Sequence, residues 1–117
     1  MTVRVPPELA IARSVVEHVA RAARGRTVRR ITLEIGDLSG VVPETVSSCF
    51  PEIARGTAAA AAQLDIRRIA GRGYCERCER EFPLADLSAA CPCGSARTHT
   101  VAGQELILKS IDIEDAQ

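Results

Sequence analysis

Aromatic residues are nearly absent from this chain of 117 residues: they make up 3% of it, and tryptophan does not occur. A hydrophobic core must therefore be aliphatic, and a hydrophobic content of 46% is enough to build one. Net charge is also lacking, because fifteen basic residues balance fifteen acidic ones. Without a basic excess or interleaved aromatic residues, the chain is not expected to bind nucleic acid.

Long apolar runs are missing as well. No stretch approaches the ~20 residues that a membrane helix needs, and the first seven residues lack the apolar stretch of a secretory signal. We therefore expect a cytoplasmic protein that does not associate with membranes. A glycine-rich phosphate loop, a Ser/His/Asp set and a convincing carboxylate pair are absent too, so an enzyme is not expected. Five cysteines in a reducing compartment favour metal or redox chemistry over disulfides.

Apolar residues at three- and four-residue steps predict two helices. The first spans residues 8–24, and its buried face consists of Leu9, Ala12, Val16, Val19, Ala20 and Ala23. The second begins at Pro43 and ends near Gly56. Pro51 lies inside it and has no backbone N–H, which predicts a kink or a split between Ser47 and Pro51.

Three strands are predicted at residues 28–35, 64–70 and 105–113. In the first, Ile31, Leu33 and Ile35 alternate with polar residues, which is typical of a strand with one buried face. The fold class is therefore α+β: two helices on one face of a three-stranded sheet, with a small metal-binding module before the last strand. Because the second and third strands flank this module in the sequence, we expect them to pair side by side.

Four cysteines form two close pairs, Cys75-x2-Cys78 and Cys91-Pro92-Cys93, with twelve residues between them. Zinc takes four tetrahedral ligands, commonly as two such pairs, so the quartet predicts one structural zinc ion. The second pair has one intervening residue instead of the usual two, which predicts a slightly irregular site.

A stability argument supports zinc. Residues 74–98 contain too few apolar residues for a core of their own, whereas zinc bound to thiolates supplies on the order of 10–16 kcal/mol. The chain therefore divides into residues 1–72 plus 99–117, an α/β domain, and residues 73–98, a zinc module. A redox-active Cys75/Cys78 pair, four free thiols, and His99 in place of one cysteine are the less favoured interpretations. We interpret Cys49 as a buried structural thiol and His18 as a solvated side chain.

Several sequence stretches, taken in order, resemble one known family. They are residues 8–16 (ELAIARSVV), residues 33–44 (LEIGDLSGVVPE), Gly56-Thr57, the cysteine module, and the closing Gly103-x-Glu105-Leu106. Over residues 8–114 this order resembles the HypA/HybF nickel metallochaperones of hydrogenase maturation.

The resemblance implies an α/β nickel-binding domain and a zinc domain whose ligands are Cys75, Cys78, Cys91 and Cys93. It also implies transient nickel binding and two partners, the GTPase HypB and the large subunit of a [NiFe]-hydrogenase; some relatives serve urease. We expect a monomer or a weak homodimer.

The nickel site of the family matches only in part. The family begins Met-His-Glu, and here Pro7-Glu8 stands at that place, several residues inside the chain, so only Glu8 carries over as a nickel-ligand candidate. Three interpretations stay open: a paralogue without this nickel site, nickel bound through the Met1 amine with Glu8 or His18, or a different N-terminus. The functional hypotheses are nickel delivery for hydrogenase maturation and, as the alternative, a zinc-stabilised adaptor that docks maturation partners without binding nickel at its N-terminus.

Overall fold

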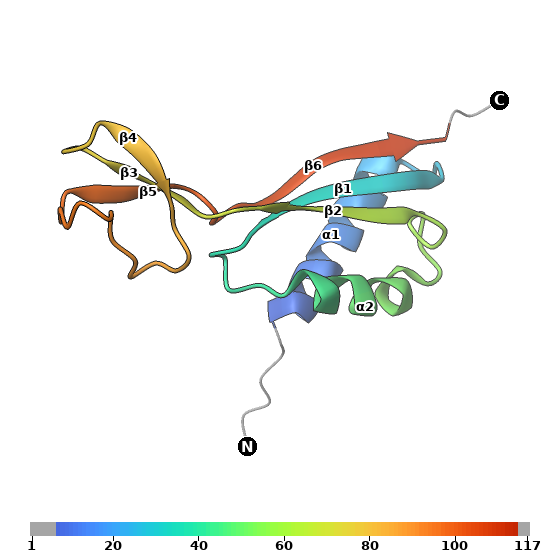
Figure 1. Cartoon of the computed structure of the whole chain (residues 1–117). Helices are drawn as coiled ribbons and strands as arrows, with labels where there is room; N and C mark the ends of the chain where they lie inside the picture. The colour runs from blue at the N-terminus through green and yellow to red at the C-terminus, as the bar shows by residue number, and fades with distance from the viewer. Residues whose placement is uncertain (1–6, 115–117) are drawn as a thin grey trace, which may run out of the picture. The chain divides into compact units, whose positions relative to one another are not determined.

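The computed structural model describes residues 7–114, which form two helices and six strands (Figure 1). In chain order the elements are α1 (Pro7–Ala23), β1 (Val28–Gly36), α2 (Pro43–Ala54), β2 (Gln63–Ile69), β3 (Arg72–Cys75), β4 (Arg80–Pro83), β5 (Thr98–Ala102) and β6 (Leu106–Ile113). Among these residues, no helix is long and apolar enough to cross a membrane.

The chain divides into two compact units. The first contains the residues up to Leu33, then Val42–Ile66, and the residues from Leu108 onward; the second contains Glu34–Val41 and Arg67–Ile107. The second unit therefore includes every residue of the module expected at 73–98, together with flanking segments. The division of the chain at residues 73–98 stays a prediction: these are the residues whose folding we expect to depend on the metal.

Helix α1 agrees with the prediction to within one residue at each end. Glu8 in its first turn and Arg21 in its last turn both suit the helix dipole. Arg24 and Gly25 follow with φ angles of 51° and 84°, and this left-handed conformation ends the helix. The buried apolar face consists of Ala12, Val16, Val19 and Ala23, whereas Leu9 and Ala20, which were also expected on it, are half-buried.

Helix α2 is continuous, so the split predicted near Ser47–Pro51 is wrong. Pro51 lies in the last turn with its ring exposed to solvent. There the missing N–H removes only the bond to the carbonyl of Ser47, and the ring meets no packed neighbour. Val46, Phe50 and Ala54 form the buried face, and α2 packs against α1.

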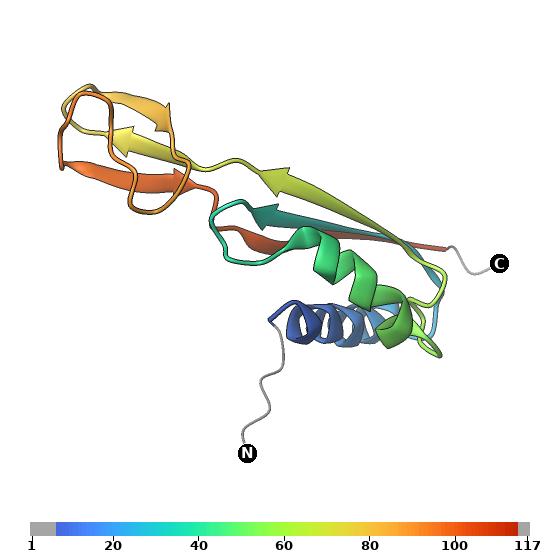
Figure 2. The ribbon, with the colours of Figure 1, turned by 60° about the horizontal axis from the view of Figure 1, so that its bottom comes forward.

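The larger sheet has the strand order β2-β1-β6, and both helices cover the same face of it (Figures 1 and 2). The two-helix, three-stranded arrangement is as predicted, but the expected pairing of β2 with the last strand is wrong, because β1 lies between them. The physical reason is that β1 is the most buried of the three strands: Ile31, Thr32 and Leu33 are consecutive and all buried, whereas β2 and β6 contain no buried residue. The strand with the largest buried surface therefore takes the position with a neighbour at both edges.

A second sheet, with the order β4-β3-β5, lies in the cysteine region and was not predicted. Gly73 pairs with Phe82 and Tyr74 pairs with His99 across antiparallel ladders. A Cβ atom on Gly73 would approach the Phe82 ring to 2.6 Å, so this glycine is needed for close packing. One small buried cluster forms here, Cys75, Phe82, Leu84 and Cys91, and two of its four members belong to the cysteine quartet.

Three glycines of the second unit allow its segments to pass in direct contact. A Cβ atom on Gly36 would overlap the carbonyl oxygen of Gly103, and one on Gly103 would lie 2.6 Å from the Cα atom of Gly71. The backbone N–H of Leu38 donates to the carbonyl of Gly103 at 2.6 Å, and its side chain packs against the cysteine-containing cluster. This crossing fixes the loop after β1 next to the cysteine-containing cluster.

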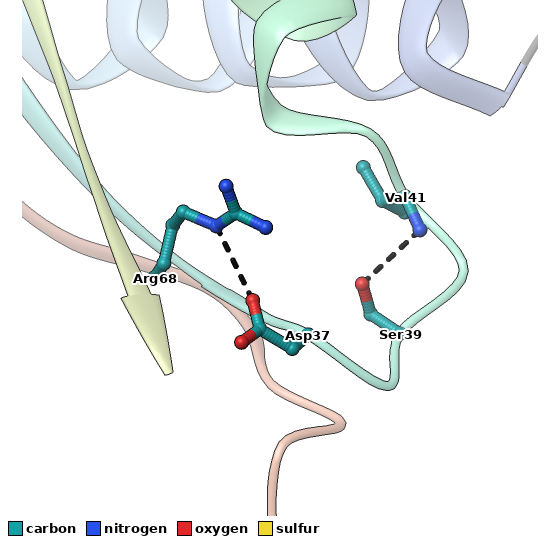
Figure 3. A network of polar contacts seen from close by, with 4 residues as sticks. All are labelled: Asp37, Ser39, Val41 and Arg68. Atoms are coloured by element: carbon teal, nitrogen blue, oxygen red, sulfur yellow. Dashed lines mark hydrogen bonds and ion pairs between the residues drawn. The ribbon is translucent and has the colours of Figure 1, made fainter. Parts of the chain in front are cut away.

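The same loop is held by polar contacts (Figure 3). The Nε atom of Arg68 donates to a carboxylate oxygen of Asp37 at 3.3 Å, and the Ser39 hydroxyl accepts from the backbone N–H of Val41 at 3.2 Å. The Arg68–Asp37 pair is solvent-exposed, so it contributes little to stability. Its role is to fix the direction of the loop, together with the bond from the Asp37 N–H to the Ile69 carbonyl.

Candidate metal centre

The first cysteine pair is formed by the end of β3 and the turn that follows. Cys75 is the last residue of β3 and fully buried. Its carbonyl accepts from the N–H of Glu79 at 2.8 Å, and its sulfur accepts from the N–H of Cys78 at 3.4 Å. Glu79 closes the turn with a φ angle of 54°. The turn directs both sulfur atoms to one side of the backbone.

The second pair occupies one tight turn in the loop between β4 and β5. The N–H of Gly94 donates to the carbonyl of Cys91 at 2.9 Å, which closes the four residues Cys91-Pro92-Cys93-Gly94. Proline in the second position and glycine in the fourth, here with a φ angle of 83°, are residues that such turns prefer. The short spacing thus places Cys93 within a regular turn, and the turn brings both cysteines to the site.

The four sulfur atoms lie at the separations of a tetrahedral metal site. The Sγ atoms of Cys75 and Cys93 are 3.6 Å apart, those of Cys78 and Cys91 are 3.8 Å apart, and all four lie within 4.8 Å of one another. Zinc–sulfur bonds of ~2.3 Å at tetrahedral angles require sulfur–sulfur distances of about 3.8 Å. The donor set and its dimensions therefore fit a zinc ion.

The separations also exclude disulfides in this state of the protein. A disulfide bond measures ~2.05 Å, far shorter than either sulfur–sulfur distance, and all five cysteines are free thiols. The interpretation that the four cysteines act as unrelated thiols does not account for their convergence from two turns onto one point.

Hydrogen bonds among the thiols move their pKa values apart. The N–H of Cys78 lowers the pKa of Cys75 to about 7, whereas hydrogen bonds with Cys93 and Cys91 raise the pKa of Cys78 to about 12. The N–H of Cys93 acts to lower the pKa of Cys91, but burial and the neighbouring thiols outweigh it and raise that pKa. A metal ion bound by the four sulfur atoms would displace their remaining protons.

The other candidate residues of the sequence lie outside the quartet. The ring of His99 lies against that of Tyr74 with a centroid distance of 5.5 Å and an interplanar angle of 43°, and His99 is exposed. Cys49 is half-buried in α2, so it is less enclosed than expected, and His18 is exposed as predicted. Within residues 7–114, the four cysteines are the one group of three or more possible metal ligands that converge.

Glu8 has a structural contact that the sequence did not reveal. Its side chain is 8% exposed, and its Oε2 atom accepts a hydrogen bond from the backbone N–H of Val42 at 3.1 Å. Val42 is the N-cap residue of α2, and the carboxylate from α1 accepts from its N–H, the bond that the glutamate of a capping box makes within one helix. His18 lies ten residues further along α1, about 15 Å away, so the two side chains do not converge. Met1, the other proposed nickel ligand, lies outside the described residues.

Comparison with known proteins decides the family. A family model described as "Hydrogenase/urease nickel incorporation, metallochaperone, hypA" matches residues 7–113. The chain belongs to the HypA family. Hydrogenase maturation factor HypA of Geobacter metallireducens is 44% identical over 108 residues, which cover 92% of this chain and 98% of the relative. The corresponding protein of a Nostoc species is 39% identical over 108 residues, or 92% of this chain and 96% of the relative.

Solved structures of HypA proteins share the fold. The solution structure of the Ni metallochaperone HypA from Helicobacter pylori aligns with a TM-score of 0.60 and 22% identity, covering 91% of this chain and 96% of the other. A second solution structure of a HypA protein aligns with a TM-score of 0.62 and 21% identity, covering 92% of this chain and 93% of the other. The resemblance found in the sequence is thus confirmed, as is the predicted fold class, apart from the order of the strands.

Proposed function

We propose that this protein is a cytoplasmic nickel metallochaperone that delivers nickel, together with the GTPase HypB, to the large subunit of a [NiFe]-hydrogenase. Membership of the HypA family across residues 7–113 is the observation that carries this proposal. Nickel is the cargo in this account, and the protein acts as a monomer or a weak homodimer. The family description also mentions urease, so the identity of the client is part of the test.

In this proposal the quartet Cys75, Cys78, Cys91 and Cys93 holds one structural zinc ion. The sulfur–sulfur distances of 3.6 and 3.8 Å support this role. Only Phe82 and Leu84 add large buried side chains to the cysteine-containing cluster. Two such side chains contribute a few kcal/mol, at about 1.5–3 kcal/mol each. The ordering of this region therefore depends on the metal.

A second candidate function is that of a zinc-stabilised adaptor, which docks maturation partners without binding nickel at its N-terminus. Two observations favour it. Pro7 stands where the family has its nickel-binding histidine, and a proline side chain has no donor atom for a metal. Glu8, the part of that motif that is retained, is buried and uses one carboxylate oxygen to bind the Val42 N–H.

Calorimetric titration with nickel separates the two candidates. The protein is prepared without an affinity tag, because a histidine tag would itself bind nickel, and it is loaded with zinc beforehand. Nickel delivery predicts binding at micromolar affinity or tighter without release of zinc. A flat trace at ~100 μM nickel contradicts autonomous nickel binding. The Glu8→Gln and His18→Ala variants identify which of these side chains takes part.

A pull-down from nickel-depleted cells addresses the adaptor directly. Recovery of the GTPase or of a hydrogenase subunit, combined with a flat nickel titration, favours the adaptor. If partner recovery requires nickel in the medium and the titration shows binding, nickel delivery is favoured. Recovery of a urease subunit in place of the hydrogenase subunit changes the client and leaves the metallochaperone role in place.

A further inference from the structure

Cys93 differs from the other members of the quartet in its exposure to solvent. Cys75 is 0% exposed and Cys91 is 7% exposed, and Cys78 is half-buried. Cys93 is exposed, because it sits in the third position of the tight turn, between the exposed residues Pro92 and Gly94. A dissolved reagent can therefore approach this residue without any opening of the fold.

A second thiol lies next to the exposed one. The Sγ atom of Cys75 is 3.6 Å from that of Cys93, while Cys78 is paired with Cys91 at 3.8 Å. Closing the first distance to the ~2.05 Å of a disulfide needs a movement of about 1.5 Å. Cys91 is a poorer partner for Cys93, because a single intervening residue would force a small, strained ring. Redox-sensitive cysteines combine these two features, access to solvent and an adjacent resolving thiol.

From this geometry we propose that Cys93 is a modification site for hydroperoxides, and that its oxidation releases the metal as a Cys75–Cys93 disulfide forms. The proposal rests on the zinc site proposed above. Metal coordination keeps the Cys93 sulfur a thiolate, which is the nucleophilic form. The half-buried Cys49 lies on α2 in the other unit and is not part of the quartet, so it lacks this pairing.

The chemistry balances in two steps. The Cys93 sulfur attacks one oxygen of hydrogen peroxide, the O–O bond breaks, and hydroxide leaves and takes up a proton to give water. The Cys75 sulfur then attacks the resulting sulfenic sulfur and displaces a second hydroxide, which is also protonated. The two thiolates lose two electrons, and peroxide is reduced to two waters. Zinc keeps only Cys78 and Cys91 as ligands and is released.

The experiment uses the full, zinc-loaded chain without a tag. Its zinc content is measured first, because a protein without zinc overturns the zinc assignment itself, separately from the oxidation. Hydrogen peroxide is then added, zinc release is followed with a chromogenic chelator, and samples are blocked with N-ethylmaleimide for peptide mapping under non-reducing conditions. Zinc release in step with a Cys75–Cys93 disulfide is the expected result. Retained zinc under excess peroxide, or a first modification at Cys78, Cys91 or Cys49, overturns the proposal.

Two variants locate the reactive sulfur. Cys93→His replaces the sulfur of the exposed residue with a nitrogen ligand and keeps four donors for zinc, whereas Cys49→Ser removes the thiol that lies outside the quartet. Cys93→His is expected to slow peroxide-driven zinc release by about tenfold or more, and Cys49→Ser to release zinc at the original rate. Equal release rates for Cys93→His and the original chain overturn the assignment to Cys93. If Cys93→His fails to bind zinc, the peptide map of the unmodified chain decides.

Discussion

The Oε2 atom of Glu8 accepts a hydrogen bond from the backbone N–H of Val42 at 3.1 Å, which ties the first turn of α1 to the N-cap of α2. By the resemblance described in the sequence analysis, Glu8 is also the residue that corresponds to the glutamate of the family's Met-His-Glu motif. Glu8 therefore has a structural role in this protein whether or not nickel binds nearby. Variants at this position test both the stability of the fold and the binding of nickel.

Removing the Glu8 carboxylate should destabilise the protein. Glu8→Ala leaves the N–H of Val42 without its acceptor and is expected to lower the free energy of unfolding by roughly 1–2 kcal/mol. Glu8→Gln keeps an oxygen acceptor and should lose less. Urea unfolding followed by far-UV circular dichroism measures both. Equal stability of Glu8→Ala and the original chain would show that the bond makes no net contribution.

The glycine crossing offers a test of packing in the second unit. Gly36→Ala places a methyl group onto the carbonyl of Gly103 and should cost more than about 3 kcal/mol, because both partners are backbone atoms. Gly40→Ala is the matched control in the same loop. It faces open space, and its φ angle of 80° limits the cost to about 1–2 kcal/mol. Thermal unfolding of the two variants should rank Gly36→Ala as clearly the less stable; the reverse order would contradict the described crossing.

The elements of the helix-bearing part could be predicted from local patterns. Apolar spacing gives α1, alternation gives β1, and Pro43 marks the start of α2, since each signal lies within the element itself. The order of the strands could not be predicted in this way, because it depends on pairing between segments far apart in the sequence. The most buried strand takes the centre, and the buried Thr32 between Ile31 and Leu33 carried that information, although a threonine is polar enough to be read as solvent-facing.

The cysteine quartet provides a test of metal-dependent folding. Cys78→Ser should release the metal and unfold residues 73–98, because Phe82 and Leu84 are too small a core to hold the second sheet alone. The α1 and α2 helices should keep their signals in amide correlation spectra. Cys49→Ser serves as the control, since that thiol lies outside the quartet. Dispersed signals for β3, β4 and β5 in the metal-free variant would contradict metal-dependent folding.

Asp86 gives a prediction about pH. The hydroxyl of Ser88 donates to its carboxylate at 2.6 Å and the Ser88 N–H at 2.9 Å, and these bonds lower the pKa of Asp86. A carboxylate with a lowered pKa in the folded state contributes stability above its unfolded pKa, and that contribution is lost as the pH falls. Ser88→Ala should raise the pKa of Asp86 towards that of an unfolded chain. Carboxyl-carbon NMR titration measures it, and an unchanged midpoint would show that the Ser88 hydroxyl is not a cause of the lowered pKa.

The metal centre was predictable as a set of residues but not as a structure. The two cysteine pairs are visible in the sequence, whereas the sheet that holds them is not, because β3 and β4 are four residues long and carry glycine and charged residues. Their alternation is too short to identify, and their pairing depends on contacts across the chain. The exposure of Cys93 and the bond from Glu8 to Val42 likewise arise only after folding.

Native mass spectrometry of the tag-free protein, before and after addition of one equivalent of nickel, tests the account most directly. This method measures the mass of the intact chain with its bound ions, so zinc and nickel are counted on the same molecule. The account predicts one zinc per chain as isolated, and one zinc plus one nickel after addition. A chain that carries no zinc as isolated, or that takes up nickel only by losing its zinc, would contradict it.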